Sequence, residues 1–140
     1  MSVPKPPRPT FNAMLICDNT IREEVTGKVS LIGIFAAIQS PAFPVVVPSL
    51  CVYLNVSDAQ GRYRLRLELM HADSMRVIGH GEGELEVGDQ RLPTEFVFQL
   101  QRLVFDRPGR YQFNISANSE LLGSKSFDVV LSNQPPGGAQ

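Results

Sequence analysis

The residues of this chain best suited to chemistry are its two histidines and two nearby carboxylates. His71 and His80 are the only histidines, Asp73 lies between them, and Glu82 follows His80 by two positions, which places it on the same strand face. Imidazole and carboxylate groups bind divalent metals, and a protein site needs about three or four of them to converge. The four residues therefore define a candidate metal site. The alternative is a pair of exposed histidines on a hairpin.

Cysteine and serine residues do not form a nucleophilic site by pattern. Cys17 and Cys51 lie in apolar runs, so both are predicted to be buried, reduced thiols, with a disulfide or a metal site as the alternative. A reactive thiolate needs a partly exposed, electropositive setting. Ser119, Ser124 and Ser126 lack the motif of a nucleophile elbow. The sequence thus predicts no catalysis and no cofactor.

Charged residues alternate along two neighbouring runs, over residues 62–71 and 75–87. In a hairpin that turns at residues 72–74, each arginine faces a glutamate and each intervening leucine faces a glycine. The opposed pairs are Arg62–Glu86, Arg64–Glu84, Arg66–Glu82, Glu68–His80, Leu65–Gly83, Leu67–Gly81 and Leu69–Gly79. A slip of one residue destroys both matches, so this register is predicted. Arginines that face glutamates are poor anion receptors, and no aromatic residue shares their face.

Length and charge narrow the possible functions. The chain has 140 residues, enough for one domain with a two-layer core. Its net charge of −1 gives no bulk attraction to nucleic acid or anionic membranes. No apolar run reaches the roughly 20 residues of a membrane helix, and residues 1–10 lack the apolar segment of a signal peptide. We therefore expect a cytoplasmic protein that binds neither nucleic acid nor membrane.

Short apolar runs between turn signals predict an all-β fold. No segment keeps a helical period with caps, and the spacing of the runs predicts eight or nine strands. The expected architecture is a two-sheet antiparallel β-sandwich of immunoglobulin-like or jelly-roll type, with a closed barrel as the alternative. The domain should cover residues 11–131. A proline-rich leader (1–10) and a polar tail (132–140) are predicted to be disordered.

The stretch expected to organise the sandwich is residues 25–35. Apolar residues occupy both of its faces, which predicts a central strand covered on both sides, and residues 13–24 should fold back on it as a hairpin. Gly33 should face the core together with Leu31 and Phe35. On this interpretation a valine at position 33 would overpack the core.

Three prolines interrupt the next apolar segment, residues 41–48. Proline cannot donate to a strand ladder, so we expect a crossover loop or an edge segment where the chain changes sheets. Four apolar residues lie in it: Phe43, Val45, Val46 and Val47. They are interpreted either as a plug for the open end of the core or as an exposed interaction surface.

These motifs together resemble a family of small uncharacterised bacterial and phage all-β proteins, a domain of unknown function. The resemblance rests on Leu15-Ile16-Cys17-Asp18, Gly27-Lys28-Val29-Ser30-Leu31-Ile32-Gly33-Ile34-Phe35, Pro41-Ala42-Phe43-Pro44, Pro108-Gly109-Arg110-Tyr111-Gln112-Phe113 and Leu122-Gly123-Ser124. It covers nearly the whole expected domain. It implies a β-sandwich and carries no activity that could be transferred.

The expected function is that of a non-catalytic binding or accessory module that contacts another protein. Two alternatives come from other classes. One is a metal-binding enzyme centred on His71 and His80, and the other is a structural homo-oligomer that pairs through an exposed edge strand. The sequence does not identify the partner.

Overall fold

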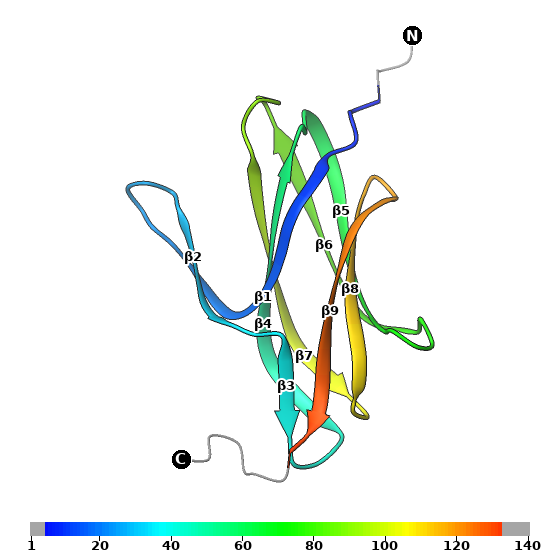
Figure 1. Cartoon of the computed structure of the whole chain (residues 1–140). Coiled ribbons are helices and arrows are strands. Elements are labelled where there is room, and N and C mark those ends of the chain that lie inside the picture. Colours follow the sequence, from blue (N-terminus) through cyan, green and yellow to red (C-terminus); the bar gives the residue numbers. More distant parts are fainter. Residues whose placement is uncertain (1–4, 133–140) are drawn as a thin grey trace.

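The computed structural model describes residues 5–132, and every regular element among them is a β-strand. Nine strands form two packed sheets (Figure 1). They are β1 (Thr10–Arg22), β2 (Val29–Ile34), β3 (Ala37–Ser40), β4 (Val45–Ser57), β5 (Gly61–His71), β6 (Val77–Val87), β7 (Thr94–Phe105), β8 (Gly109–Ala117) and β9 (Glu120–Leu131). This confirms the predicted two-sheet β-sandwich. No helix in this range is long and apolar enough to cross a membrane.

The two sheets differ in size and have four edges in total. One sheet has four strands in the order β2-β1-β4-β7, and the other has five in the order β3-β9-β8-β5-β6. Neighbouring strands are antiparallel except β3, which runs parallel to β9. The edges are therefore β2 and β7 in the first sheet, and β3 and β6 in the second.

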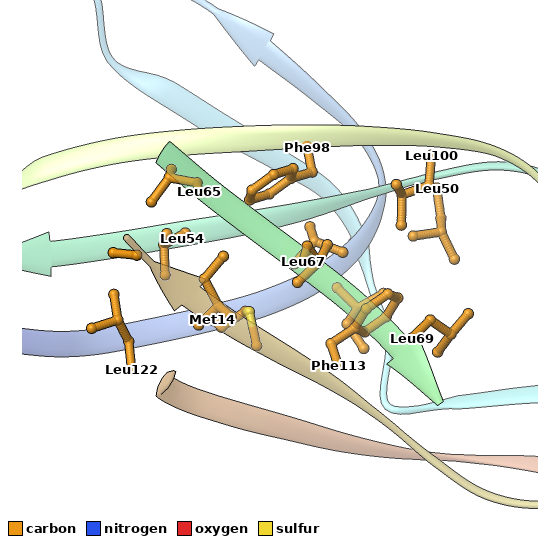
Figure 2. Packing of buried hydrophobic residues seen from close by; sticks show 14 of the residues in the cluster. Met14, Leu50, Leu54, Leu65, Leu67, Leu69, Phe98, Leu100, Phe113 and Leu122 are labelled. Atoms are coloured by element: carbon orange, nitrogen blue, oxygen red, sulfur yellow. The ribbon is translucent and has the colours of Figure 1, made fainter. Parts of the chain in front are cut away.

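Apolar side chains from both sheets meet in one core (Figure 2). Leu65, Leu67 and Leu69 of β5 alternate inward as predicted and are at most 1% exposed. Leu54 of β4 and Phe98 of β7 belong to the same cluster, from the facing sheet. Period-2 alternation thus buries one face of each sheet against the other.

The predicted β5–β6 register is confirmed from Gly61↔Val87 to Leu69↔Gly79, beyond which a bulge shifts the pairing. The glycines of β6 leave room for side chains of β7, which lies beside it. A Cβ at Gly81 would lie 3.1 Å from Leu100, and one at Gly83 would collide with the ring of Phe96. Leucines of β5 oppose these glycines, as predicted, and side chains of β7 pack on the glycine backbone.

Residues 25–35 do not form a central strand, so that prediction is wrong. Their strand, β2, lies at the edge of the four-stranded sheet, and Ile32 and Ile34 are exposed. Gly33 does not face the core, because it is exposed and has a φ of 71°, and the Asp18 carboxylate occupies the space of a side chain there. Apolar residues on both faces predict burial on both faces, whereas in the structure no residue of β2 is fully buried. The predicted hairpin with β1 is confirmed.

The chain changes sheets between β3 and β4, inside the proline-rich segment, as predicted. β4 begins at Val45 and runs through Pro48, and this first part pairs with β7 alone, which confirms the predicted edge segment. The strand has neighbours on both sides only from Cys51 to Val56, because β1 pairs only with residues 51–57 of it and β7 only with residues 45–56. Pro48 therefore lies where one side of β4 is unpaired, which a proline tolerates.

Part of the proline-rich leader lies against the sandwich. Pro9 is buried, and the Tyr63 hydroxyl donates a hydrogen bond of 2.6 Å to the carbonyl of Pro7. Lys5 forms an ion pair of 2.7 Å with Glu120 and holds the pKa of that carboxyl below its ordinary value. Residues 5–9 thus differ from the solvated leader expected over residues 1–10. Residues 1–4 and the tail at 133–140 lie outside the described residues.

We expect Gly83→Ala to destabilise the domain by about 1–3 kcal/mol, because the added methyl group would displace the ring of Phe96 from the β6 backbone. Gly88→Ala is the matched control, since nothing lies within 4 Å of the position of a Cβ there. Urea unfolding of both variants gives the two free energies. An equal loss in both would show that the β6–β7 contact does not depend on glycine.

Candidate functional site

The structure separates the four candidate metal ligands. His71 is 4% exposed, with its ring 4.4 Å from that of Tyr111 and its Nε2 atom 3.3 Å from Asp106 Oδ1. His80 is exposed opposite Glu68 on the outer face of β6, and Asp73 lies 3.7 Å from Arg107. No cluster of three or more metal-ligating side chains forms within residues 5–132.

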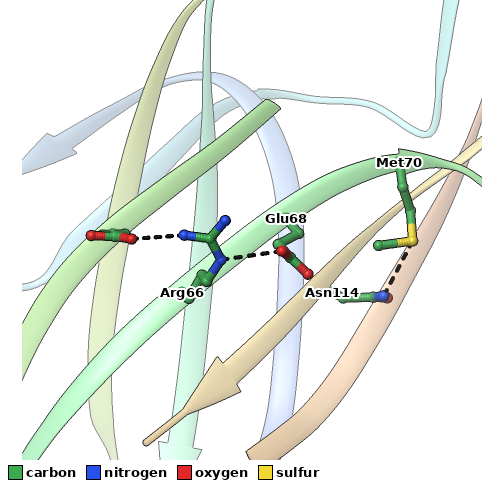
Figure 3. A network of polar contacts seen from close by, with 5 residues as sticks. Arg66, Glu68, Met70 and Asn114 are labelled. Carbon is green, nitrogen blue, oxygen red and sulfur yellow. Dashed lines mark hydrogen bonds and ion pairs between the residues drawn. The ribbon is translucent and has the colours of Figure 1, made fainter. Parts of the chain in front are cut away.

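Glu82, the fourth candidate, belongs to a polar network on the outer face of the five-stranded sheet (Figure 3). Its Oε1 atom lies 2.7 Å from Nη1 of Arg66, whose Nε donates a bond of 3.1 Å to Glu68. The Asn114 amide donates to the sulfur of Met70 on the same face, at 3.5 Å. Arg66 thus contacts both Glu82 and Glu68, so the Glu82 carboxylate is already paired with an arginine.

Only two of the three predicted arginine–glutamate pairs are in contact. Arg62 and Arg66 each reach their glutamate, whereas no ion pair joins Arg64 to Glu84 in the described part of the chain. Arg64 and Glu84 line a hollow of about 620 Å³ over β5, β6 and β8. Three arginines and two glutamates line this hollow, but Arg62 is paired with Glu86 and Arg66 with Glu82, so little net positive charge is left for an anion.

The four apolar residues of the proline-rich segment divide into two groups. Phe43, Val45 and Val47 are partly buried and pack against the core, as expected of a plug. Val46 is 50% exposed and lies opposite Val104 of β7, which is 51% exposed. The exposed apolar surface here is therefore a single valine pair within the described residues.

Cys17 and Cys51 face each other directly across β1 and β4. Both are free thiols, and they are 0% and 4% exposed. Burial raises the pKa of the Cys17 thiol, and the neighbouring Cys51 raises it further.

The feature that sequence reasoning missed is a projecting arm, residues 18–34, formed by the end of β1 and by β2. Figure 1 shows it projecting from the rest of the sandwich. Four exposed apolar side chains lie on it: Ile21 (53%), Val25 (92%), Ile32 (45%) and Ile34 (57%). Backbone hydrogen bonds of 2.9 Å, from Glu23 to Lys28 and from Gly27 to Glu23, close its tip. The arm is thus an ordered hairpin with an apolar surface.

The free edge of the arm lacks the protection that the other edges have. β6 carries glutamates and lies beside β7, whose side chains cover its glycines. β7 is interrupted by Arg102 at a φ of 55°, and β3 spans only Ala37–Ser40 before Pro41. β2 contains neither a charge nor a proline, and its one irregular residue, Gly33 at a φ of 71°, lies near its end. Such an edge is a template for pairing with another strand.

Comparison with known proteins gives a family without an assigned function. The profile of a family of unknown function (DUF6941) matches residues 12–130, which include the arm and nearly all of both sheets. No curated protein matches the chain. Among solved structures the chain is similar to an immunoglobulin-like protein from Pseudomonas aeruginosa, with 12% identity, 89% of this chain and 98% of that chain covered, and a TM-score of 0.40.

We expect Ellman's reagent to label neither Cys17 nor Cys51 in the folded protein. Both thiols are shielded from solvent, and the raised pKa of Cys17 keeps its thiolate fraction small at neutral pH. Both should react once denaturant is added, which provides the internal control. Rapid labelling in buffer would indicate an accessible thiol and revive a redox or metal role.

Proposed function

We propose that this chain, which belongs to the family of unknown function DUF6941, is a non-catalytic protein-binding module whose binding element is the arm. The observation that carries the proposal is β2, an uncharged edge strand with apolar side chains exposed beside it. Unpaired edge strands bind partners by strand addition, in which main-chain hydrogen bonds supply affinity and side-chain contacts supply specificity.

The chemistry of the arm selects the kind of partner. Ile21 and Ile32 lie on one face of the arm, because their opposed residues are Ser30 and Asn19. A strand bound to the free edge of β2 would lie beside Ile32 and would cover it only with apolar side chains of its own. The partner segment is therefore extended, uncharged and apolar, and it lacks proline at paired positions.

Other observations support a binding role over catalysis. His71 is buried against Tyr111, Glu82 is engaged by Arg66, and the thiols of Cys17 and Cys51 are shielded. A cytoplasmic location agrees with these two free, buried thiols. The proposal includes no nucleic-acid partner, in keeping with the net charge of −1. An origin in bacteria or phages stays a prediction.

A peptide probe tests strand addition directly. We would use a fluorescent peptide with the sequence of residues 28–35, carrying extra lysines for solubility, and follow its anisotropy as the full chain is added. We expect saturable binding that Ile32→Lys and Ile34→Lys in the protein weaken at least about tenfold, because each places a charge on the apolar surface.

Val104→Lys is the matched control, since Val104 is 51% exposed on β7, away from the arm. It should leave peptide affinity unchanged. A second control is the same peptide with proline in place of its Leu31, which removes a main-chain donor and should not bind. Absence of saturable binding, or equal weakening by Val104→Lys, would refute the proposal.

A further inference from the structure

We infer that the strand that pairs with β2 is the β2 of a second copy of this chain, so that two arms join antiparallel about a twofold axis. This inference rests on the proposed function and names its partner. A strand paired antiparallel with itself forms an isologous contact, in which one surface patch serves both copies. The same association places the exposed Ile32 and Ile34 of each β2 beside the partner's β2.

The composition of β2 permits this self-pairing. Like charges that face each other across neighbouring strands are destabilising. Val29–Ile34 carries no charge, so no register of two β2 strands brings like charges together within this segment. β6, the edge strand of the five-stranded sheet that lies beside β5, would instead oppose its own glutamates, Glu82, Glu84 and Glu86.

Two charged groups outside β2 favour the antiparallel arrangement. Lys28 immediately precedes β2 at the tip of the arm, and Asp18 lies beside Gly33 at its base. Neither side chain has an ion pair or a side-chain hydrogen bond within the described residues. Antiparallel pairing brings the tip of one arm to the base of the other, and therefore Lys28 of each copy toward Asp18 of its partner.

Gly33 contributes to this contact by leaving the approach open. A side chain at position 33 would occupy the place of the Asp18 carboxylate, and the φ of 71° favours glycine there. With glycine, the Asp18 carboxylate can lie against β2 within reach of a long side chain from the neighbouring strand. Lysine has a flexible four-carbon stem suited to that reach.

Sedimentation velocity over a range of concentrations tests the inference with the full chain. We expect the 15.5 kDa chain to shift toward twice that mass as its concentration rises. Lys28→Asp and Asp18→Lys should each raise the dimer dissociation constant about tenfold, because each change affects two symmetric contacts. The double variant restores opposite charges and should return the constant to within about threefold of the original.

The control variant for surface charge is Arg76→Asp, at an exposed position just before β6 of the other sheet, which should leave the dimer unchanged. Circular dichroism and melting temperature establish that each variant is folded.

A chain that stays monomeric while the 28–35 peptide still binds would overturn self-pairing and leave the strand-addition function standing. A dimer that Ile32→Lys does not weaken, or a double variant no better than the single ones, would also overturn the inference. Loss of both the dimer and peptide binding would overturn both proposals.

Discussion

The contact between the inner faces of the two sheets is the interaction on which the rest of the structure depends. Neither sheet can bury its apolar face alone, and full burial of one leucine side chain contributes about 1.5–3 kcal/mol. Leu65, Leu67 and Leu69 lie near the middle of this contact and come from β5, which has neighbours on both sides. This contact between the inner faces positions the outer faces, the edges and the arm.

At one side of the sandwich the two sheets are joined by large side chains packed on glycines and not by strand hydrogen bonds. β6 and β7 belong to different sheets, and side chains of β7 rest on the glycine backbone of β6. The alternation of glycine with charged residues in β6 therefore does two things. It admits Phe96 and Leu100 from the inside, and it places Glu82 and Glu84 on the outside, where they discourage further pairing.

Features set by local pattern, such as strand register and the burial of single residues, could be predicted from the sequence. The position of a whole strand within its sheet could not. The β5–β6 register was readable because charge and size patterns had to agree at once. The burial of Cys17 and Cys51 was readable from their apolar runs. The edge position of β2 was not readable, since an apolar strand looks alike at the centre of a sheet and at an exposed edge.

The same distinction between local pattern and tertiary packing applies to the candidate sites. His71 and His80 are close in sequence, but the bulge after Leu69 and the turn that follows separate their environments, and one ring becomes buried while the other stays exposed. Residue type could suggest a metal site, yet convergence depends on tertiary packing that no local spacing contains. The arm was hidden for the converse reason, because its residues look like ordinary core residues.

The arm and the core share one strand, and this fixes where binding can act. β1 pairs with β4 from Thr10 to Cys17 and with β2 from Cys17 to Arg22, so Cys17 is the residue at which the sandwich ends and the arm begins. The core half of β1 includes Met14 and Ile16, which are buried between the sheets. A strand held in this way over half its length presents the other half in a fixed direction. Under the proposed function, the isoleucines exposed on this arm are buried by a bound strand and not by the sandwich itself.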